Sequence, residues 1–262
     1  MRSTNANIKP TVVIAGAATF GALAALISLL APPVIQPSFP ILFYLKFDIA
    51  EIVDVTAFLI FGPIAGLVTA TVHATILTAA PGGAGPFGAS LKFLSVLSTY
   101  GGLILASRLG KHKLLTTGSI MTVIGVLTRV VIMTLVNYLY LIVLAQVVFG
   151  VDYSYFAQLT LSAIGINLTG TGFVFYILGL TAIFNAIHAV FSIVVSLVLV
   201  NAILTRAPQL VAGRERIRRT LTFPGASKKS FSFAERSGRF GLWDCGQQPL
   251  GLSGLLPWDQ YR

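Results

Sequence analysis

Long runs of hydrophobic residues alternate along this chain with short polar or turn-rich stretches. Most runs approach or exceed the ~20 residues that a helix needs to cross a hydrocarbon core, and they lack the two-residue alternation of a barrel strand. Backbone groups in lipid must be hydrogen-bonded within their own segment, so we interpret each run as a helix. The pattern predicts an all-α integral membrane protein with segments at about 11–30, 55–61, 64–80, 89–106, 114–149 and 173–204.

Proline and glycine separate these segments. The first ends at Pro32 and Pro33, which cannot continue a regular helix. Gly62 and Pro63 divide the second segment from the third, so we expect a tight helical hairpin there. Residues 81–88, PGGAGPFG, predict a loop. The fifth segment is longer than one crossing needs, and we expect it to be broken, tilted or extended past the membrane surface.

Lysine and arginine gather at the N-terminus, at residues 108–113 and in the C-terminal tail, where residues 206–262 hold 10 of the 18 basic residues. Cytoplasmic loops of membrane proteins carry such an excess. Six crossings would place all three regions on one side, which predicts an N-in/C-in topology. We therefore expect a cytoplasmic N-terminus at 1–10, a six-helix membrane domain at 11–206, and a basic, disordered cytoplasmic tail at 207–262.

Composition supports the membrane class. The chain is 55% hydrophobic and 10% charged, with a mean hydropathy of +0.86. Its net charge of +10 is explained more simply by anionic lipid next to the tail than by nucleic acid, which we do not expect as a partner. The single cysteine, Cys245, allows neither an internal disulfide nor a cysteine metal cluster.

A charged stretch, YLKFDIAEI at 44–52, follows the first segment. It places Lys46, Asp48 and Glu51 close together, with Asp54 soon after. The three carboxylates follow one another at three-residue intervals and could share one helical face. Either they cap a helix at the membrane interface, which we favour, or they bind a metal ion.

Motifs for ATP hydrolysis are missing, because no GxxxxGK[ST] loop occurs. The predicted inner loops offer basic residues only, whereas a membrane enzyme acting on a lipid or isoprenoid would need carboxylates or histidines there. We therefore expect no enzyme, no metal and no cofactor. An accessory membrane protein without a small ligand stays open as a third class.

The first segment carries a face of small residues at four-residue spacing, which permits close helix contact in lipid. This face serves either packing within the bundle or docking of another membrane subunit. Its members are Ala17, Ala18, Gly21, Ala22 and Ala25.

Several polar side chains lie inside apolar segments, where they are costly and tend to face the bundle interior. They are His73, Lys92, Arg129, Asn137, Asn185 and His188. An amide presents a donor beside an acceptor, and nearby aromatic rings such as Tyr138 offer stacking area, so the pattern suits a flat heterocycle. No role follows from the sequence for Arg129.

Four stretches together carry a family resemblance: FYLKFDIAEI followed by FLIFGPIAGLV, GPFGASLKFL, VVIMTLVNYLYLIVL and FNAIHAVFSIVVSLVLV. With these motifs the chain resembles the S components, the substrate-binding membrane subunits of energy-coupling factor (ECF) vitamin transporters, over roughly residues 10–206. It is most similar to the riboflavin-specific branch.

The resemblance implies a six-helix subunit in the cell membrane that captures riboflavin at its outer face. A transmembrane coupling subunit, docked on the small-residue face, and two ATPase subunits would then drive delivery inward. The substrate-binding residues implied are Tyr44, Lys46, Asp48, Asn137, Asn185 and His188.

Two positions depart from the flavin branch. His188 stands where that branch usually has lysine, and Glu51, Ile52 and Val53 stand where its lid usually reads Asp-Ile-Pro. Riboflavin is the first expectation, and another flat vitamin or a flavin precursor is the alternative.

Overall fold

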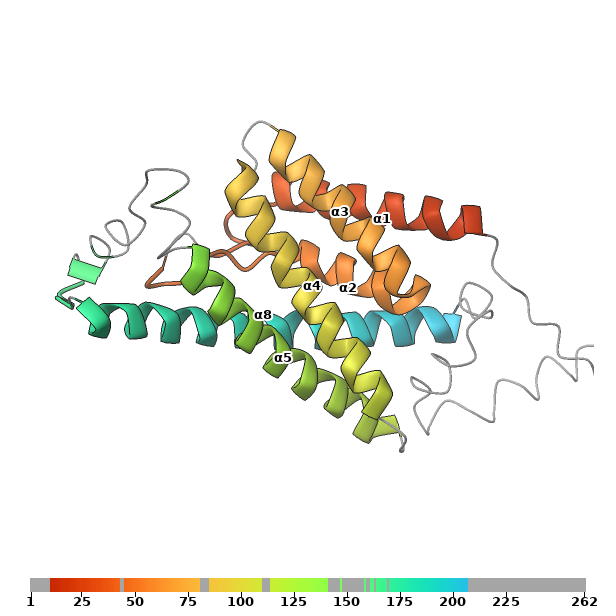
Figure 1. Ribbon diagram of the computed structural model, residues 1–262. Coiled ribbons are helices and arrows are strands. Elements are labelled where there is room, and N and C mark those ends of the chain that lie inside the picture. Colours follow the sequence, from red (N-terminus) through yellow and green to blue (C-terminus); the bar gives the residue numbers. More distant parts are fainter. Residues whose placement is uncertain are drawn as a thin grey trace, which may run out of the picture. The chain divides into compact units, whose positions relative to one another are not determined.

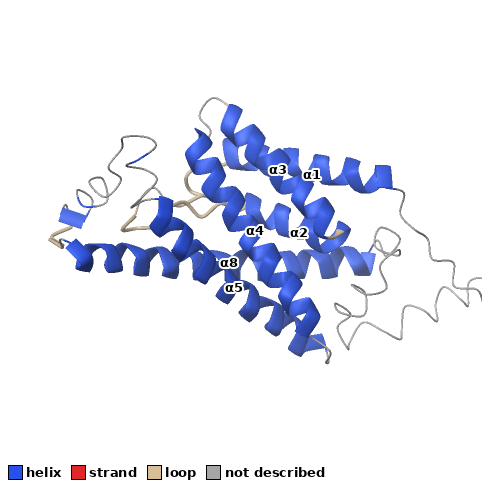
Figure 2. Ribbon diagram, viewed as in Figure 1, coloured by secondary structure: helices blue, strands red, loops and turns tan. Residues whose placement is uncertain are grey.

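A computed structural model describes residues 10–42, 45–80, 85–109, 114–140, 147, 158, 161–162, 164–168 and 170–206. This part of the chain is helical and contains no strand beyond an isolated bridge between Ser38 and Lys46. The helices are α1 (Pro10–Leu30), α2 (Ala50–Phe61), α3 (Pro63–Ala79), α4 (Gly85–Leu109), α5 (Leu114–Tyr138) and α8 (Gly170–Arg206) (Figures 1 and 2).

Four of these helices, α1, α4, α5 and α8, are long and apolar enough to cross a membrane. The chain is therefore a multi-pass membrane protein. Helix α2 has 12 residues and α3 has 17, which is short of the ~20 residues needed for one crossing. The predicted six crossings and the N-in/C-in orientation stay predictions.

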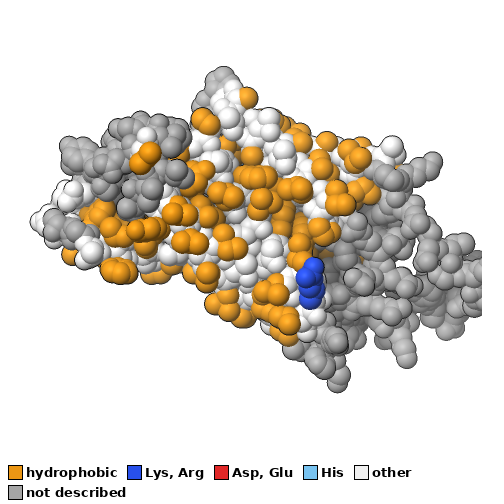
Figure 3. Space-filling view, viewed as in Figure 1, with side chains coloured by type: hydrophobic (Ala, Val, Ile, Leu, Met, Phe, Trp, Pro, Cys, Tyr) orange, Lys and Arg blue, Asp and Glu red, His pale blue; other side chains and the backbone are white. Residues whose placement is uncertain are grey.

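The distribution of apolar and charged side chains between surface and interior is the reverse of that in a soluble protein. Large apolar side chains are exposed on several helices, among them Ile64, Val131 and Phe175, which are 80%, 67% and 75% exposed. Charged Glu51 and Arg129 are each only 1% exposed. Hydrophobic side chains cover much of the described surface in Figure 3. Lipid is the solvent that fits such a surface.

Helix α2 lies at the centre of the bundle, where it contacts α1, α3, α4 and α8 (Figure 1). Its apolar side chains join the main hydrophobic core, in which Phe58 stacks on Tyr100 with ring centroids 4.4 Å apart. A second apolar cluster packs Leu42 against Phe173 and Ile177. This second cluster holds the segment before α2 against the first part of α8.

The predicted hairpin is confirmed. Gly62 separates α2 from α3 with a φ of 94°, a left-handed value that favours glycine, and Pro63 occupies the first turn of α3. A Cβ on Gly66 would lie 2.8 Å from the Phe58 ring, so the two helices depend on glycine for their close approach as well.

The predicted starts of two helices were wrong. Helix α2 begins at Ala50, not near residue 55, so Glu51 and Asp54 belong to a buried helix. Helix α4 begins at Gly85 and takes up part of the predicted loop. Helix α5 ends at Tyr138, and most of the predicted remainder to residue 149 lies outside the described residues, as does the tail from 207.

Candidate functional site

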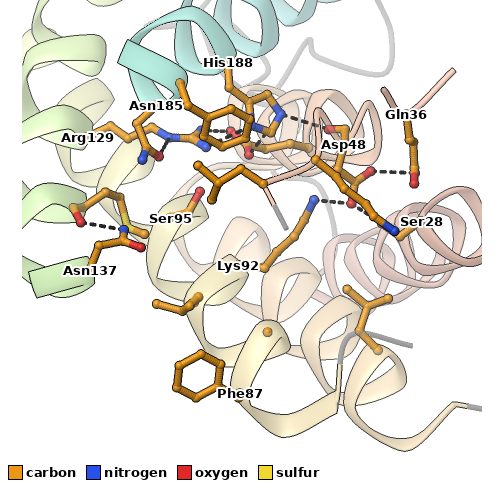
Figure 4. A pocket seen from close by; sticks show the side chains of 18 of the residues that line it. Ser28, Gln36, Asp48, Phe87, Lys92, Ser95, Arg129, Asn137, Asn185 and His188 are labelled. Atoms are coloured by element: carbon orange, nitrogen blue, oxygen red, sulfur yellow. Dashed lines mark hydrogen bonds and ion pairs between the residues drawn. The ribbon is translucent and has the colours of Figure 1, made fainter. Parts of the chain in front are cut away.

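A cavity of about 440 Å³ opens between the segment before α2 and helices α1, α4, α5 and α8 (Figure 4). Its apolar wall includes Leu29, Leu45, Leu77, Phe87 and Phe184. Its polar and charged lining consists of Ser28, Gln36, Lys46, Asp48, Glu51, Lys92, Ser95, Arg129, Asn137, Asn185 and His188.

Asp48 joins three parts of the chain at one edge of this cavity. Its carboxylate accepts hydrogen bonds from Ser28 Oγ at 2.5 Å and Gln36 Nε2 at 3.1 Å, and it pairs with the ammonium group of Lys92 on α4. It also accepts the backbone N–H of Ala50, the first residue of α2, at 2.8 Å. Burial by itself raises the pKa of Asp48, but Lys92 and these donors outweigh it and lower the pKa to about 2.

Glu51 and Arg129 form a second ion pair, which is buried in the wall of the cavity. Arg129 on α5 also donates from Nε to Asn185 Oδ1 at 3.2 Å. Its remaining contacts are with Thr99 on α4 and His188 on α8. Ser192 donates to the same Glu51 oxygen that pairs with Arg129, at 3.0 Å. One guanidinium group thus links α2, α4, α5 and α8.

The two asparagines line the cavity from two neighbouring helices. Asn137 on α5 donates to the carbonyl of Met133 at 2.7 Å, which uses one of its two N–H donors. Asn185 on α8 donates to the carbonyl of Thr181 at 2.9 Å and accepts from Arg129. The orientation of the Asn185 amide is therefore fixed, because an arginine can only donate.

A third polar group connects the cavity edge to α2 and α3. His73 Nδ1 lies 2.8 Å from Asp54 Oδ2, and its Nε2 lies 2.9 Å from Ser28 Oγ. The contacts from carboxylate to imidazole to hydroxyl are those of the Asp–His–Ser triad of a hydrolase. Asp48 is ionised at neutral pH and has no proton to share, so the proton between Asp48 and Ser28 comes from the serine. Ser28 consequently accepts from His73, which is not the arrangement of an activated nucleophile.

Five of the six residues expected to bind substrate line this one cavity. Asp48, Asn137, Asn185 and His188 point toward a common space in Figure 4, and Lys46 is exposed in the segment that borders it. Tyr44 lies outside the described residues. Contact of these side chains with a ligand stays a prediction.

The side chain of Asp48 is mostly buried, at 13% exposed, and is paired with Lys92. The three carboxylates at 48, 51 and 54 do not share one site. Each takes a different basic partner: Lys92, Arg129 and His73. No group of three metal-binding side chains occurs in the part of the chain that the structure describes.

Ser28, Gln36 and Ser95 were not identified from the sequence as cavity residues, and Lys92 and Arg129 were noticed without a role. Serine and glutamine near apolar segments are too common to single out. The signal for Lys92 and Arg129 was their charge inside hydrophobic segments, which requires a partner.

The small-residue face of α1 packs within the chain. Ala17, Gly21 and Ala25 are buried, and the Thr69 hydroxyl of α3 donates to the carbonyl of Ala17 at 3.0 Å. Ala18 and Ala22 are only partly buried. Internal packing therefore accounts for one row of this face, and docking of another subunit on these residues stays a prediction.

Comparison of the chain with protein-family models, with curated proteins and with solved structures found no match.

Proposed function

We propose that this protein is the substrate-binding subunit of an ECF-type importer and that it captures riboflavin, or a related flat vitamin, in the described cavity. The observation that carries the proposal is the cavity itself, which is lined by amides from α5 and α8 and by the segment before α2. The four sequence stretches that resemble riboflavin-specific S components contribute side chains to its lining.

The size and chemistry of the cavity support a small organic ligand. Its volume of about 440 Å³ falls within the range of ~300–1,000 Å³ typical of such sites. Leu45 and Phe184 provide apolar and aromatic area beside Asn137 and Asn185. A flat ring with polar edges would use both kinds of surface.

Transport by this route requires partners. The chain has no phosphate-binding loop, so import would depend on a transmembrane coupling subunit and two ATPase subunits. We propose the cell membrane as the location, with capture at the outer face. The exposed apolar helix surfaces supply area for both lipid and a coupling subunit.

Ligand binding is tested with purified protein in detergent. We expect flavin absorption in the isolated protein, and saturable quenching of riboflavin fluorescence when ligand-depleted protein is added. Asn137→Ala should weaken binding at least about tenfold, which corresponds to ~1.4 kcal/mol. Asn201→Ala is the matched control, because Asn201 lies on α8 but does not line the cavity.

Two outcomes would redirect the proposal. Absence of quenching up to high micromolar riboflavin would reject the flavin and lead to a screen of other flat vitamins. Equal weakening by Asn137→Ala and Asn201→Ala would mean that the loss comes from general destabilisation and not from the cavity.

A further inference from the structure

The guanidinium group of Arg129 has four hydrogen-bonding partners inside the bundle. Arg129 is 1% exposed and contacts Glu51, Thr99, Asn185 and His188. Glu51 is also 1% exposed, and the ion pair with Arg129 balances its charge. Because neither group reaches water, each depends on the other to stay charged in the interior.

Two neighbours of His188 fix its protonation state by their chemistry. Arg129 Nη2 lies 3.2 Å from His188 Nδ1, and arginine has donors only, so Nδ1 must be the bare nitrogen that accepts. The carbonyl oxygen of Asp48 lies 3.1 Å from Nε2 and can only accept, so Nε2 must carry a proton. The hydrogen bonds therefore require a neutral ring with its proton on Nε2.

The surroundings of His188 agree with a neutral ring. Phe47 and Phe184 pack against it with ring centroids 5.8 and 5.5 Å away. The other Glu51 oxygen, Oε2, lies 3.7 Å from Nε2 and has no hydrogen bond from the described residues. The Nε2 proton is thus directed at the backbone of Asp48 and not at the carboxylate.

We propose that Arg129 is a positioning residue for the cavity, which holds His188 in the neutral Nε2–H form and so directs it to bind the Asp48 carbonyl. In this way α5 determines how α8 is attached to the segment before α2. The cavity then has no positive charge at position 188, although histidine is the residue type most easily charged near neutral pH.

Charged groups act on His188 from three helices: Glu51 on α2, Lys92 on α4 and Arg129 on α5. The segment before α2 contributes the backbone carbonyl of Asp48. The Glu51 carboxylate, with Oε2 3.7 Å from Nε2, would favour a positive charge on the ring, whereas the Arg129 guanidinium beside Nδ1 opposes one. Removing the arginine charge would therefore leave His188 as the nearest group able to balance Glu51.

The first test is Arg129→Gln, followed by the melting temperature between about pH 5 and 8. In this variant His188 should take up a second proton and pair with Glu51. The melting temperature of the variant, relative to wild type, should therefore be several degrees higher near pH 5 than near pH 8. It should fall as pH rises past the ordinary histidine pKa of ~6.5. Glu51→Gln/Arg129→Gln removes both charges and should lose this pH dependence. Arg129→Gln/His188→Gln should lose it as well.

A second measurement uses the unaltered protein and holds even if Arg129→Gln does not fold. Nitrogen-15 NMR of the histidine side chains distinguishes the Nε2–H form, the Nδ1–H form and the charged ring. We expect His188, assigned by comparison with His188→Gln, to show the Nε2–H form across the same pH range. A charged ring or the Nδ1–H form at neutral pH would overturn the proposal, as would identical pH profiles for wild type and Arg129→Gln.

Neither measurement needs a ligand. The role of Arg129 can therefore be rejected while riboflavin binding is confirmed, and riboflavin binding can be rejected while the role of Arg129 is confirmed. If the proposed function is correct, riboflavin affinity should become pH-dependent in Arg129→Gln and not in the double variant with Glu51→Gln. A pH-dependent affinity in both variants would assign the titration to another group and overturn the role of Arg129.

Discussion

Asp48 is the residue at which the segment before α2 is attached to the bundle. Its side chain binds Ser28, Gln36 and Lys92, and its carbonyl accepts from His188. The family resemblance implied that Asp48 binds the substrate. The sequence could not indicate Lys92 as its partner, because the two are 44 positions apart and no local spacing rule connects them.

We predict that Asp48→Asn destabilises the fold by about 1–3 kcal/mol, because Lys92 then loses the carboxylate that balances its mostly buried charge. The measurement is the free energy of unfolding in detergent. Lys92→Met should cost a similar amount. The double variant should cost less than the sum of both, by ~0.5–3 kcal/mol, if the two side chains are coupled. Additive losses would contradict a direct pair.

Acid should weaken the same attachment. Asp48 lies before α2, and its pKa falls from 3.8 to about 2 on folding, so the stability it contributes is present above the ordinary value and is lost as pH falls toward 2. The difference in melting temperature between wild type and Asp48→Asn should be constant at neutral pH and shrink between about pH 4 and 2. A difference that stays constant down to pH 2 would assign the effect to geometry and not to charge.

At the scale of elements, Gly and Pro marked the breaks between helices correctly, as Gly62 shows, whereas the start of α2 was placed too late. The reason is that the charges of Glu51 and Asp54 predict exposed positions as long as their partners are unknown. Arg129 is 78 positions from Glu51, and His73 is 19 from Asp54. Burial of α2 follows from these pairs, which only the tertiary arrangement brings together.

The contact between α1 and α3 gives a prediction for one glycine. A Cβ on Gly21 would lie 2.7 Å from the carbonyl oxygen of Thr69 and 2.8 Å from the Val72 Cβ, so Gly21→Ala must push the two helices apart. We expect a loss of about 1–3 kcal/mol in unfolding free energy. Gly101→Ala on α4 is the control: a Cβ there meets nothing within 4 Å, and alanine should stabilise the helix by up to ~1 kcal/mol. Equal effects of the two substitutions would contradict the close approach of α1 and α3.

At the scale of the whole molecule, hydrophobic run length predicted the helical membrane class because lipid restricts the backbone to few solutions. It could not determine the number of crossings. Helix α2 is buried mainly by its neighbours, whereas α3 keeps an exposed face that includes Ile64. A short apolar helix inside a bundle has the same composition as a helix that spans the membrane. Orientation rests on charge bias alone, which no contact within the bundle tests.

The single cysteine allows the topology to be measured directly. If the tail is cytoplasmic, a membrane-impermeant maleimide should label Cys245 only after cells are opened. In a Cys245→Ser background, Lys46→Cys should instead react in intact cells, because the cavity edge is predicted to face outward and Lys46 is exposed. If both positions react from the same side of the membrane, the predicted orientation of either the tail or the cavity is wrong. Capture at the outer face requires that the two positions react from opposite sides.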